Sequence, residues 1–132
     1  MIKVTKGDNI IQKIDYDVIT KQFVNLFYTS WMTDLNEIIL PKILRQYSSI
    51  KYDGKTYKGE DFYTLLLSYQ TGEKFVINIL KLDFIDSGSR RIDISVFGKM
   101  TKGSIEKYFS QTFILCNNKD EWFIKNSILI II

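Results

Sequence analysis

Residues 50–59, IKYDGKTYKG, place an Asp-Gly pair between two short runs in which apolar and polar side chains alternate. A type I′ turn requires positive φ at both central residues, and Asp-Gly accepts this conformation, so the pattern is a strong signal for a β-hairpin. Glu60 and Asp61 follow Gly59, and acidic side chains stabilise the positive end of a helix. The stretch predicts that the chain reverses at Asp53-Gly54 and then enters a helix.

Helical periodicity marks the chain on both sides of this hairpin. A first helix is predicted after Asp15 and Asp17 from apolar residues spaced three and four apart, which are Ile19, Phe23, Leu26, Phe27 and Trp31. Thr33 or Asp34 is expected to cap a second, shorter helix that meets the only proline, Pro41. A third helix is predicted after the hairpin, ending near Gly72, with an apolar face of Phe62, Leu65, Leu66 and Tyr69.

The period changes to two after Gly72. Residues 75–86, 90–100, 105–116 and 122–131 form four long runs separated by short polar loops, which we interpret as an antiparallel meander. Runs longer than the usual strand of about five or six residues favour curved strands, with Gly98 at a bulge or bend. The predicted fold class is α+β: one domain over residues 1–132, in which three N-terminal helices pack on one face of a cone-shaped, curved antiparallel sheet.

Composition limits the chemistry that the chain can carry. Histidine is absent, which excludes Ser-His-Asp triads and most zinc sites, and the single cysteine, Cys116, cannot form an intramolecular disulfide. We therefore expect no metal and no cofactor. The N-terminus lacks an apolar signal-peptide core, and no run approaches the roughly 20 apolar residues of a membrane span, so we expect a soluble protein without membrane partners. Net charge is +3 with acids and bases interleaved, so any contact with RNA is expected to be indirect.

Four motifs follow one another in a characteristic order. They are FVNLFYTSW at 23–31, IKYDGKTYKG at 50–59, VFGKM at 96–100 with FSQTFIL at 109–115, and EWFIKNSIL at 121–129. They resemble the helix opening, the Trp-x-Gly hairpin, the Gly-x-(Leu/Val) and Phe-x-Gln-x-Phe-x-Leu strands and the closing Trp-x-(Ile/Val)-x-Asn strand of the nuclear transport factor 2 family. The resemblance spans roughly residues 16 to 130. It implies a cone in which the helices close over a bent sheet, leaving an apolar mouth, and in which the outer sheet face pairs two subunits.

The loop between the two middle strands departs from one branch of that family. Carriers of Ran-GDP place an acidic cluster there, whereas this chain has Lys102 and Lys107 with Glu106 as the one acid. Like charges across an interface suppress a partner, so the pattern is more similar to the small subunit of the messenger-RNA export heterodimer. That resemblance implies a non-enzymatic transport factor of the nucleus, nuclear pore and cytoplasm that pairs with a homologous domain of an export receptor and supports docking to phenylalanine-glycine nucleoporins. A homodimeric carrier of Ran-GDP is the alternative.

The resemblance also points to two sets of binding residues. Those expected at the cone mouth are Trp31, Tyr52, Asp53, Tyr57, Glu106 and Phe109, the aromatic ones being open to a second interpretation as plain core. Asp53 either serves the turn alone or also contacts a basic side chain of a partner. The five aliphatic residues at the end of the chain cannot all face one core in a strand, so we expect a subunit interface on the outer face that includes Phe97, Ile114, Leu129 and Ile131.

A cone-fold isomerase or dehydratase is a further alternative from a different class. Such an enzyme uses a buried carboxylate in the pocket, and Asp83 and Asp93 alternate with apolar residues in predicted strands. If either faced inward, it would be a candidate general base. Because strand acids more often face solvent and no histidine is available, we expect no enzymatic activity and no catalytic residues.

Overall fold

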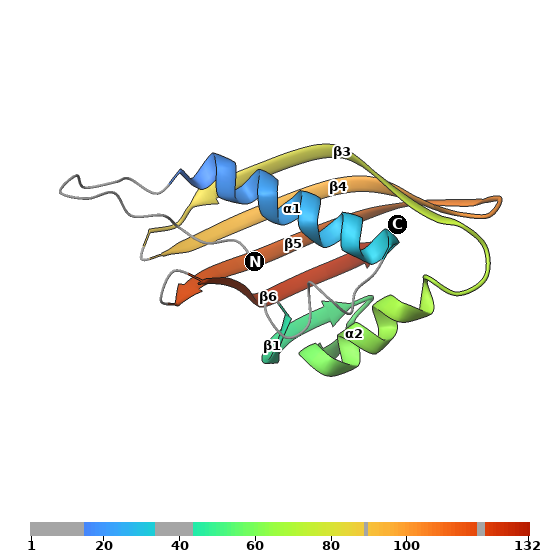
Figure 1. Ribbon diagram of the computed structural model, residues 1–132, viewed down its shortest axis with the longest axis horizontal. Helices are drawn as coiled ribbons and strands as arrows, with labels where there is room; N and C mark the ends of the chain where they lie inside the picture. Colours follow the sequence, from blue (N-terminus) through green and yellow to red (C-terminus); the bar gives the residue numbers. More distant parts are fainter. Residues whose placement is uncertain (1–14, 34–43, 89, 119–120) are drawn as a thin grey trace.

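Figure 1 shows the computed structural model of the protein, which describes residues 15–33, 44–88, 90–118 and 121–132. The order of elements is α1 (Tyr16–Met32), β1 (Leu44–Tyr52), β2 (Lys55–Lys58), α2 (Gly59–Ser68), β3 (Phe75–Asp86), β4 (Arg91–Lys102), β5 (Ile105–Asn118) and β6 (Glu121–Ile131). The predicted hairpin, the helix that follows it and the four long strands are therefore confirmed. Within the described ranges, neither helix combines the length and the apolar character of a membrane span.

Two of the three predicted helices are observed. Asp15 caps α1, where its Oδ1 accepts a hydrogen bond of 3.1 Å from the backbone N–H of Val18. The helix predicted after the hairpin is α2, whose first turn contains Glu60 and Asp61. The helix predicted between Thr33 and Pro41 lies outside the described residues, so an arrangement of three N-terminal helices is not observed.

The six strands form one sheet in the order β2-β1-β6-β5-β4-β3. The prediction of a fully antiparallel sheet is wrong at one position, because β1 pairs with β6 in parallel, with Ile50 opposite Ser127 and Tyr52 opposite Leu129. Parallel neighbours need a long crossover connection, and here everything from β2 to β5 provides it. The strand before the Asp-Gly turn also begins at Leu44, earlier than the alternating pattern at Ile50 indicates.

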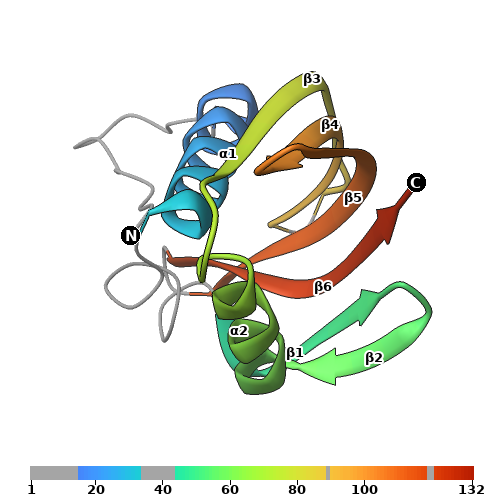
Figure 2. The same cartoon turned by 90° about the vertical axis from the view of Figure 1, so that its right-hand side faces the viewer.

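The sheet curves around α1 to form the cone (Figure 2). Aromatic rings fill the concave side: the Phe113 ring centroid lies 5.0 Å from those of both Phe23 and Phe27. On β4, Ile92, Ile94 and Val96 are buried against this core, as their alternation predicts. The concave face is therefore the inner face of the sheet, and the opposite face is the outer face.

Gly98 lies beside one of the irregularities of the sheet. The β-bulge itself lies in the partner strand β3, between Ile79 and Lys81, and Gly98 pairs with Ile79 beside it. A Cβ at Gly98 would lie 2.7 Å from both the carbonyl oxygen of Asn78 and Cε1 of Phe109. Glycine is needed because the bulged backbone and a core ring occupy that space, and the prediction of a bulge or bend here is confirmed.

Candidate functional site

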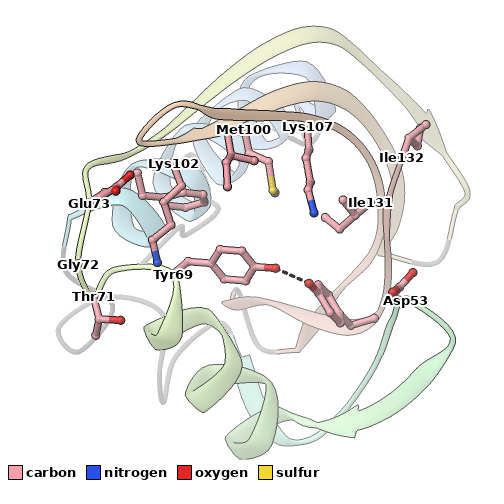
Figure 3. Close-up of a pocket in the computed structure, with 13 residues that line it drawn as sticks. Asp53, Tyr69, Thr71, Gly72, Glu73, Met100, Lys102, Lys107, Ile131 and Ile132 are labelled. Atoms are coloured by element: carbon pink, nitrogen blue, oxygen red, sulfur yellow. Dashed lines mark hydrogen bonds between the residues drawn. The ribbon is translucent and has the colours of Figure 1, made fainter.

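A pocket opens at the mouth of the cone, beside the Asp53-Gly54 turn (Figure 3). Its volume is about 810 Å³, within the range of roughly 300–1,000 Å³ that is typical of ligand sites. The residues that form it come from the β1–β2 turn, the segment after α2, the β4–β5 hairpin and the end of β6. Those used below are Tyr52, Asp53, Tyr69, Glu73, Phe75, Met100, Lys102, Lys107 and Ile131.

Two tyrosines form the polar centre of this pocket. The hydroxyl groups of Tyr52, on β1, and Tyr69, the residue that follows α2, are hydrogen-bonded to each other. Burial, reinforced by this hydrogen bond, raises the pKa of Tyr69 well above its ordinary value. Tyr69 is therefore a neutral phenol at physiological pH, and the pair can donate a hydrogen bond to a ligand.

The wall of the pocket is apolar and rests on the protein core. Phe75, Met100 and Ile131 face the opening from three different strands. Trp31 lies directly behind, with its ring centroid 5.4 Å from that of Tyr69 and 5.1 Å from that of Phe75. Its indole N–H donates to the carbonyl oxygen of Leu66 at 3.1 Å, which ties α1 to α2. The pocket is therefore built on a rigid base.

The six residues expected at the cone mouth occupy three different environments. Tyr52 and Asp53 line the pocket, and Tyr57 packs edge-on against Tyr52 at 6.3 Å between ring centroids. Trp31 and Phe109 are fully buried core residues beneath it. Glu106 lies outside the lining, exposed on β5 with its carboxylate 3.5 Å from Nζ of Lys99. The residues expected from the resemblance therefore lie at or near the mouth end of the cone, but they differ in how deeply their side chains are buried.

Several lining residues were not anticipated as a site. Tyr69 follows the helical period of α2 and was assigned to an apolar face, although it lies just past the helix end. The sequence gives one signal for Lys102 and Lys107, because the resemblance implies acidic residues at these positions near the β4–β5 turn. Only the folded chain brings both lysines to the pocket that Tyr52 and Tyr69 line.

Asp53 has a defined structural role. Its φ is +47° and that of Gly54 is +86°, as a type I′ turn requires, and its backbone N–H donates to the carbonyl oxygen of Leu129 at 3.0 Å. The turn interpretation of Asp53 is confirmed, and a contact with a partner stays a prediction.

Replacing Asp53 separates these roles. Asp53→Asn is expected to change the free energy of unfolding by less than about 0.5 kcal/mol, because asparagine also tolerates the left-handed conformation. Asp53→Val is expected to destabilise by about 1–2 kcal/mol, since a β-branched residue is strained there. Urea denaturation measures both. Equal stability of the two variants would contradict a conformational role, and a loss of partner affinity in Asp53→Asn would reveal a contact made by the charge.

The carboxylates considered for an enzyme face away from the pocket. Asp83 and Asp93 lie on the outer face, opposite to the inward positions of Ile92 and Ile94. The Arg91 guanidinium, with its Nε 2.8 Å from Asp93, holds the pKa of that carboxyl below its ordinary value. The hypothesis that one of these acids faces inward is therefore wrong. Among the described residues, no group of three or more His, Cys, Asp or Glu side chains is arranged to hold a metal ion.

The outer face of the sheet is the second candidate surface. Phe97, Tyr108, Ile128 and Ile130 are exposed on three adjacent strands, and the Phe97 and Tyr108 rings stack at 5.7 Å. Of the residues predicted for a subunit interface, Phe97 is exposed here and Ile114 is partly buried here. The placement of Leu129 and Ile131 on this face is wrong: Leu129 is fully buried and Ile131 lines the pocket. Pairing of Leu129 with the buried Gln111 sets the register, which turns Ile128 and Ile130 outward.

Solved structures share this fold at low sequence identity. Nuclear transport factor 2 from Cryptosporidium parvum is 18% identical and has a TM-score of 0.74, with 89% of this chain and 94% of that chain covered. The yeast UBP3-associated protein Bre5 is 17% identical and has a TM-score of 0.74, with 91% and 98% covered. A ketosteroid isomerase-like protein from Shewanella frigidimarina is 13% identical and has a TM-score of 0.70, with 83% and 93% covered.

These likenesses establish the nuclear transport factor 2-like fold. They include a transport factor and an isomerase-like protein, so the fold alone does not select an activity. No protein-family model matches the sequence, and no curated protein matches it.

Proposed function

We propose that this protein is a non-enzymatic nucleocytoplasmic transport factor that works by binding other proteins. In this proposal its outer sheet face pairs with the homologous domain of an mRNA-export receptor, and the resulting dimer supports docking to phenylalanine-glycine nucleoporins. Its sites of action are the nucleus, the nuclear pore and the cytoplasm. The alternative is a homodimer that carries Ran-GDP.

The observation that carries the proposal is the apolar outer face. Phe97, Tyr108, Ile128 and Ile130 are 38%, 48%, 44% and 49% exposed. They are neighbours across β4, β5 and β6, because Ser110 pairs with both Phe97 and Ile130. Single exposed hydrophobic residues are ordinary, but a group of them on a sheet face that no described helix covers is typical of a protein–protein interface. The described helices pack on the inner face and leave this group uncovered.

Three further observations support this proposal over its alternatives. The two acids that line the pocket, Asp53 and Glu73, are exposed at its edge and are not the buried carboxylate expected of a cone-fold enzyme. Lys102 and Lys107 flank the β4–β5 turn, which disfavours the basic surface of a Ran partner. The structural neighbours include a nuclear transport factor and a protein that associates with another protein, UBP3.

The first test is the oligomeric state. We expect a dimer, either of this chain alone or with a co-expressed homologous domain. Ile128→Lys is expected to raise the dissociation constant of this dimer by at least about tenfold, because a buried unpaired charge opposes association. Val18→Lys is the matched control, because Val18 is also 44% exposed but lies on α1. Sedimentation velocity measures both variants. A wild-type chain that stays monomeric at high concentration and recovers no homologous partner would contradict the proposal.

The second test identifies the partner. The tagged protein is purified from its source cell, and the co-purifying chains are quantified. A large partner with its own domain of this fold at one-to-one stoichiometry supports export, whereas Ran with bound GDP supports the alternative. Recovery of neither, with the apolar face intact, would count against both.

A further inference from the structure

The pocket at the cone mouth contains a cation, Lys107, that has no partner among the described residues. Lys107 Nζ forms no hydrogen bond or ion pair with the described residues, although its side chain lines the pocket. Figure 3 shows Lys107, a residue of β5, directed toward the hydroxyl of Tyr69, which is hydrogen-bonded to that of Tyr52. Lys102, at the end of β4, points toward the end of α2 at the pocket edge, where its Nζ lies 3.5 Å from the carbonyl oxygen of Ser68. Positive charge therefore enters the pocket from the β4–β5 hairpin.

A hydrogen-bond donor is available beside this charge. Two phenol hydroxyls carry two protons, and the hydrogen bond between Tyr52 and Tyr69 uses one of them. The second proton is left to donate outward, whichever tyrosine holds it. Phenols ordinarily ionise only near about pH 10, so this donor persists through the physiological pH range. One ammonium and one phenol O–H match the two oxygens of a carboxylate.

The acidic residues of the pocket lie at its margins. The Glu73 carboxylate lies against Gly103 of the β4–β5 turn, in the space that a Cβ at that position would occupy. Asp53 occupies the opposite edge, in the β1–β2 turn. The two carboxylates are separated from each other by the tyrosine pair (Figure 3). The two carboxylates therefore lie at the margins of the opening, and the Lys107 ammonium is directed toward its centre.

The remaining surface is suited to an apolar ligand body. Phe75, Met100 and Ile131 supply aromatic, thioether and aliphatic contacts, and a thioether adapts to ligands of varied shape. The volume of about 810 Å³ exceeds what one protein side chain fills.

We propose that this pocket binds a small amphipathic carboxylate, with its apolar body against Phe75, Met100 and Ile131 and its carboxylate between Lys107 and the Tyr52–Tyr69 hydroxyls. This ligand site is separate from the outer sheet face. The site and the proposed subunit interface can therefore succeed or fail independently.

Isothermal titration calorimetry with three probes of equal chain length tests the charge requirement. We expect octanoate to bind at least about tenfold more tightly than octan-1-ol or octylamine, because only the carboxylate engages both Lys107 and a phenol proton. Lys107→Gln is expected to weaken octanoate about tenfold and to leave octan-1-ol unchanged. Tyr69→Phe is expected to weaken octanoate by a smaller factor, since it removes one hydroxyl from the pair.

Lys125→Gln is the matched control, because it removes the same charge from an exposed position on β6 that does not line the pocket. We expect it to leave octanoate binding unchanged. Far-UV circular dichroism and sedimentation velocity of each variant show that it is folded and whether its oligomeric state is retained. Equal affinity for the three probes, no binding of octanoate, or equal effects of Lys107→Gln and Lys125→Gln would overturn the proposal and would leave the outer-face interface untouched.

Discussion

Trp31→Ala is expected to lower the free energy of unfolding by about 3–5 kcal/mol, the usual cost of truncating a fully buried aromatic side chain. Trp31 has no exposed surface and packs against Phe27 and against Tyr69 and Phe75, two rings that line the pocket. Its indole also bridges α1 to α2 through the carbonyl oxygen of Leu66. The substitution would thus leave a cavity where the two helices and β3 meet.

Urea denaturation followed by far-UV circular dichroism measures this loss. Trp31→Phe keeps an aromatic ring at this position and is expected to lower the free energy of unfolding by less than Trp31→Ala does. Val18→Ala truncates a residue on the same helix that is 44% exposed and should change stability by less than about 0.5 kcal/mol. A loss below about 1 kcal/mol for Trp31→Ala would mean that the site collapses or that the helices do not meet through this residue.

Gln111→Leu is expected to lower the free energy of unfolding by about 1–3 kcal/mol, because it leaves a buried hydroxyl without a partner. The Tyr28 hydroxyl donates to Oε1 of Gln111 at 2.6 Å, and Nε2 of Gln111 donates to the Ser127 hydroxyl at 3.2 Å. Gln111 is fully buried and Tyr28 is 2% exposed. Ser127 keeps a partner in either case, since its hydroxyl donates to the carbonyl oxygen of Thr112 at 2.7 Å.

A double-mutant cycle identifies the interaction. Tyr28→Phe alone leaves the amide oxygen of Gln111 without a donor and should lower the free energy of unfolding by a similar amount. Tyr28→Phe combined with Gln111→Leu removes both polar groups, so the double variant should lose clearly less than the sum of the two. Thr112→Ala is the control, because Thr112 is the neighbouring residue on the exposed face. Additive losses in the cycle would show that the Tyr28–Gln111 hydrogen bond does not stabilise the fold.

The glutamine of the FSQTFIL stretch shows what a sequence motif predicts and what it leaves unexplained. The motif places Gln111 between Phe109 and Phe113, and the alternation of a strand puts all three on one face. That a polar residue belongs on this apolar face has no local explanation. It follows from Tyr28, which is 83 positions away in sequence and supplies the partner.

Interactions between near neighbours were determined by the sequence itself. The Asp53-Gly54 turn follows from backbone sterics, the start of α1 from the Asp15 cap, and the inward side of β4 from alternation at Ile92, Ile94 and Val96. Each of these features depends on residues that are only a few positions apart in the sequence. The same reasoning detects strands whose two faces differ, which is why β3 to β6 were predicted and the polar beginning of β1 was not.

Only the tertiary structure decided the features that depend on distant pairing. The aliphatic run at the end of β6 has no alternation to show which side chains face outward, and its register against β5 turned Leu129 inward and Ile128 outward. The parallel pairing of β1 with β6 and the meeting of Tyr52, Tyr69 and Lys107 in one pocket arise in the same way. Local sequence determines the conformation of a segment, whereas contacts across the fold determine its neighbours, because those contacts form only when the whole sheet closes around α1.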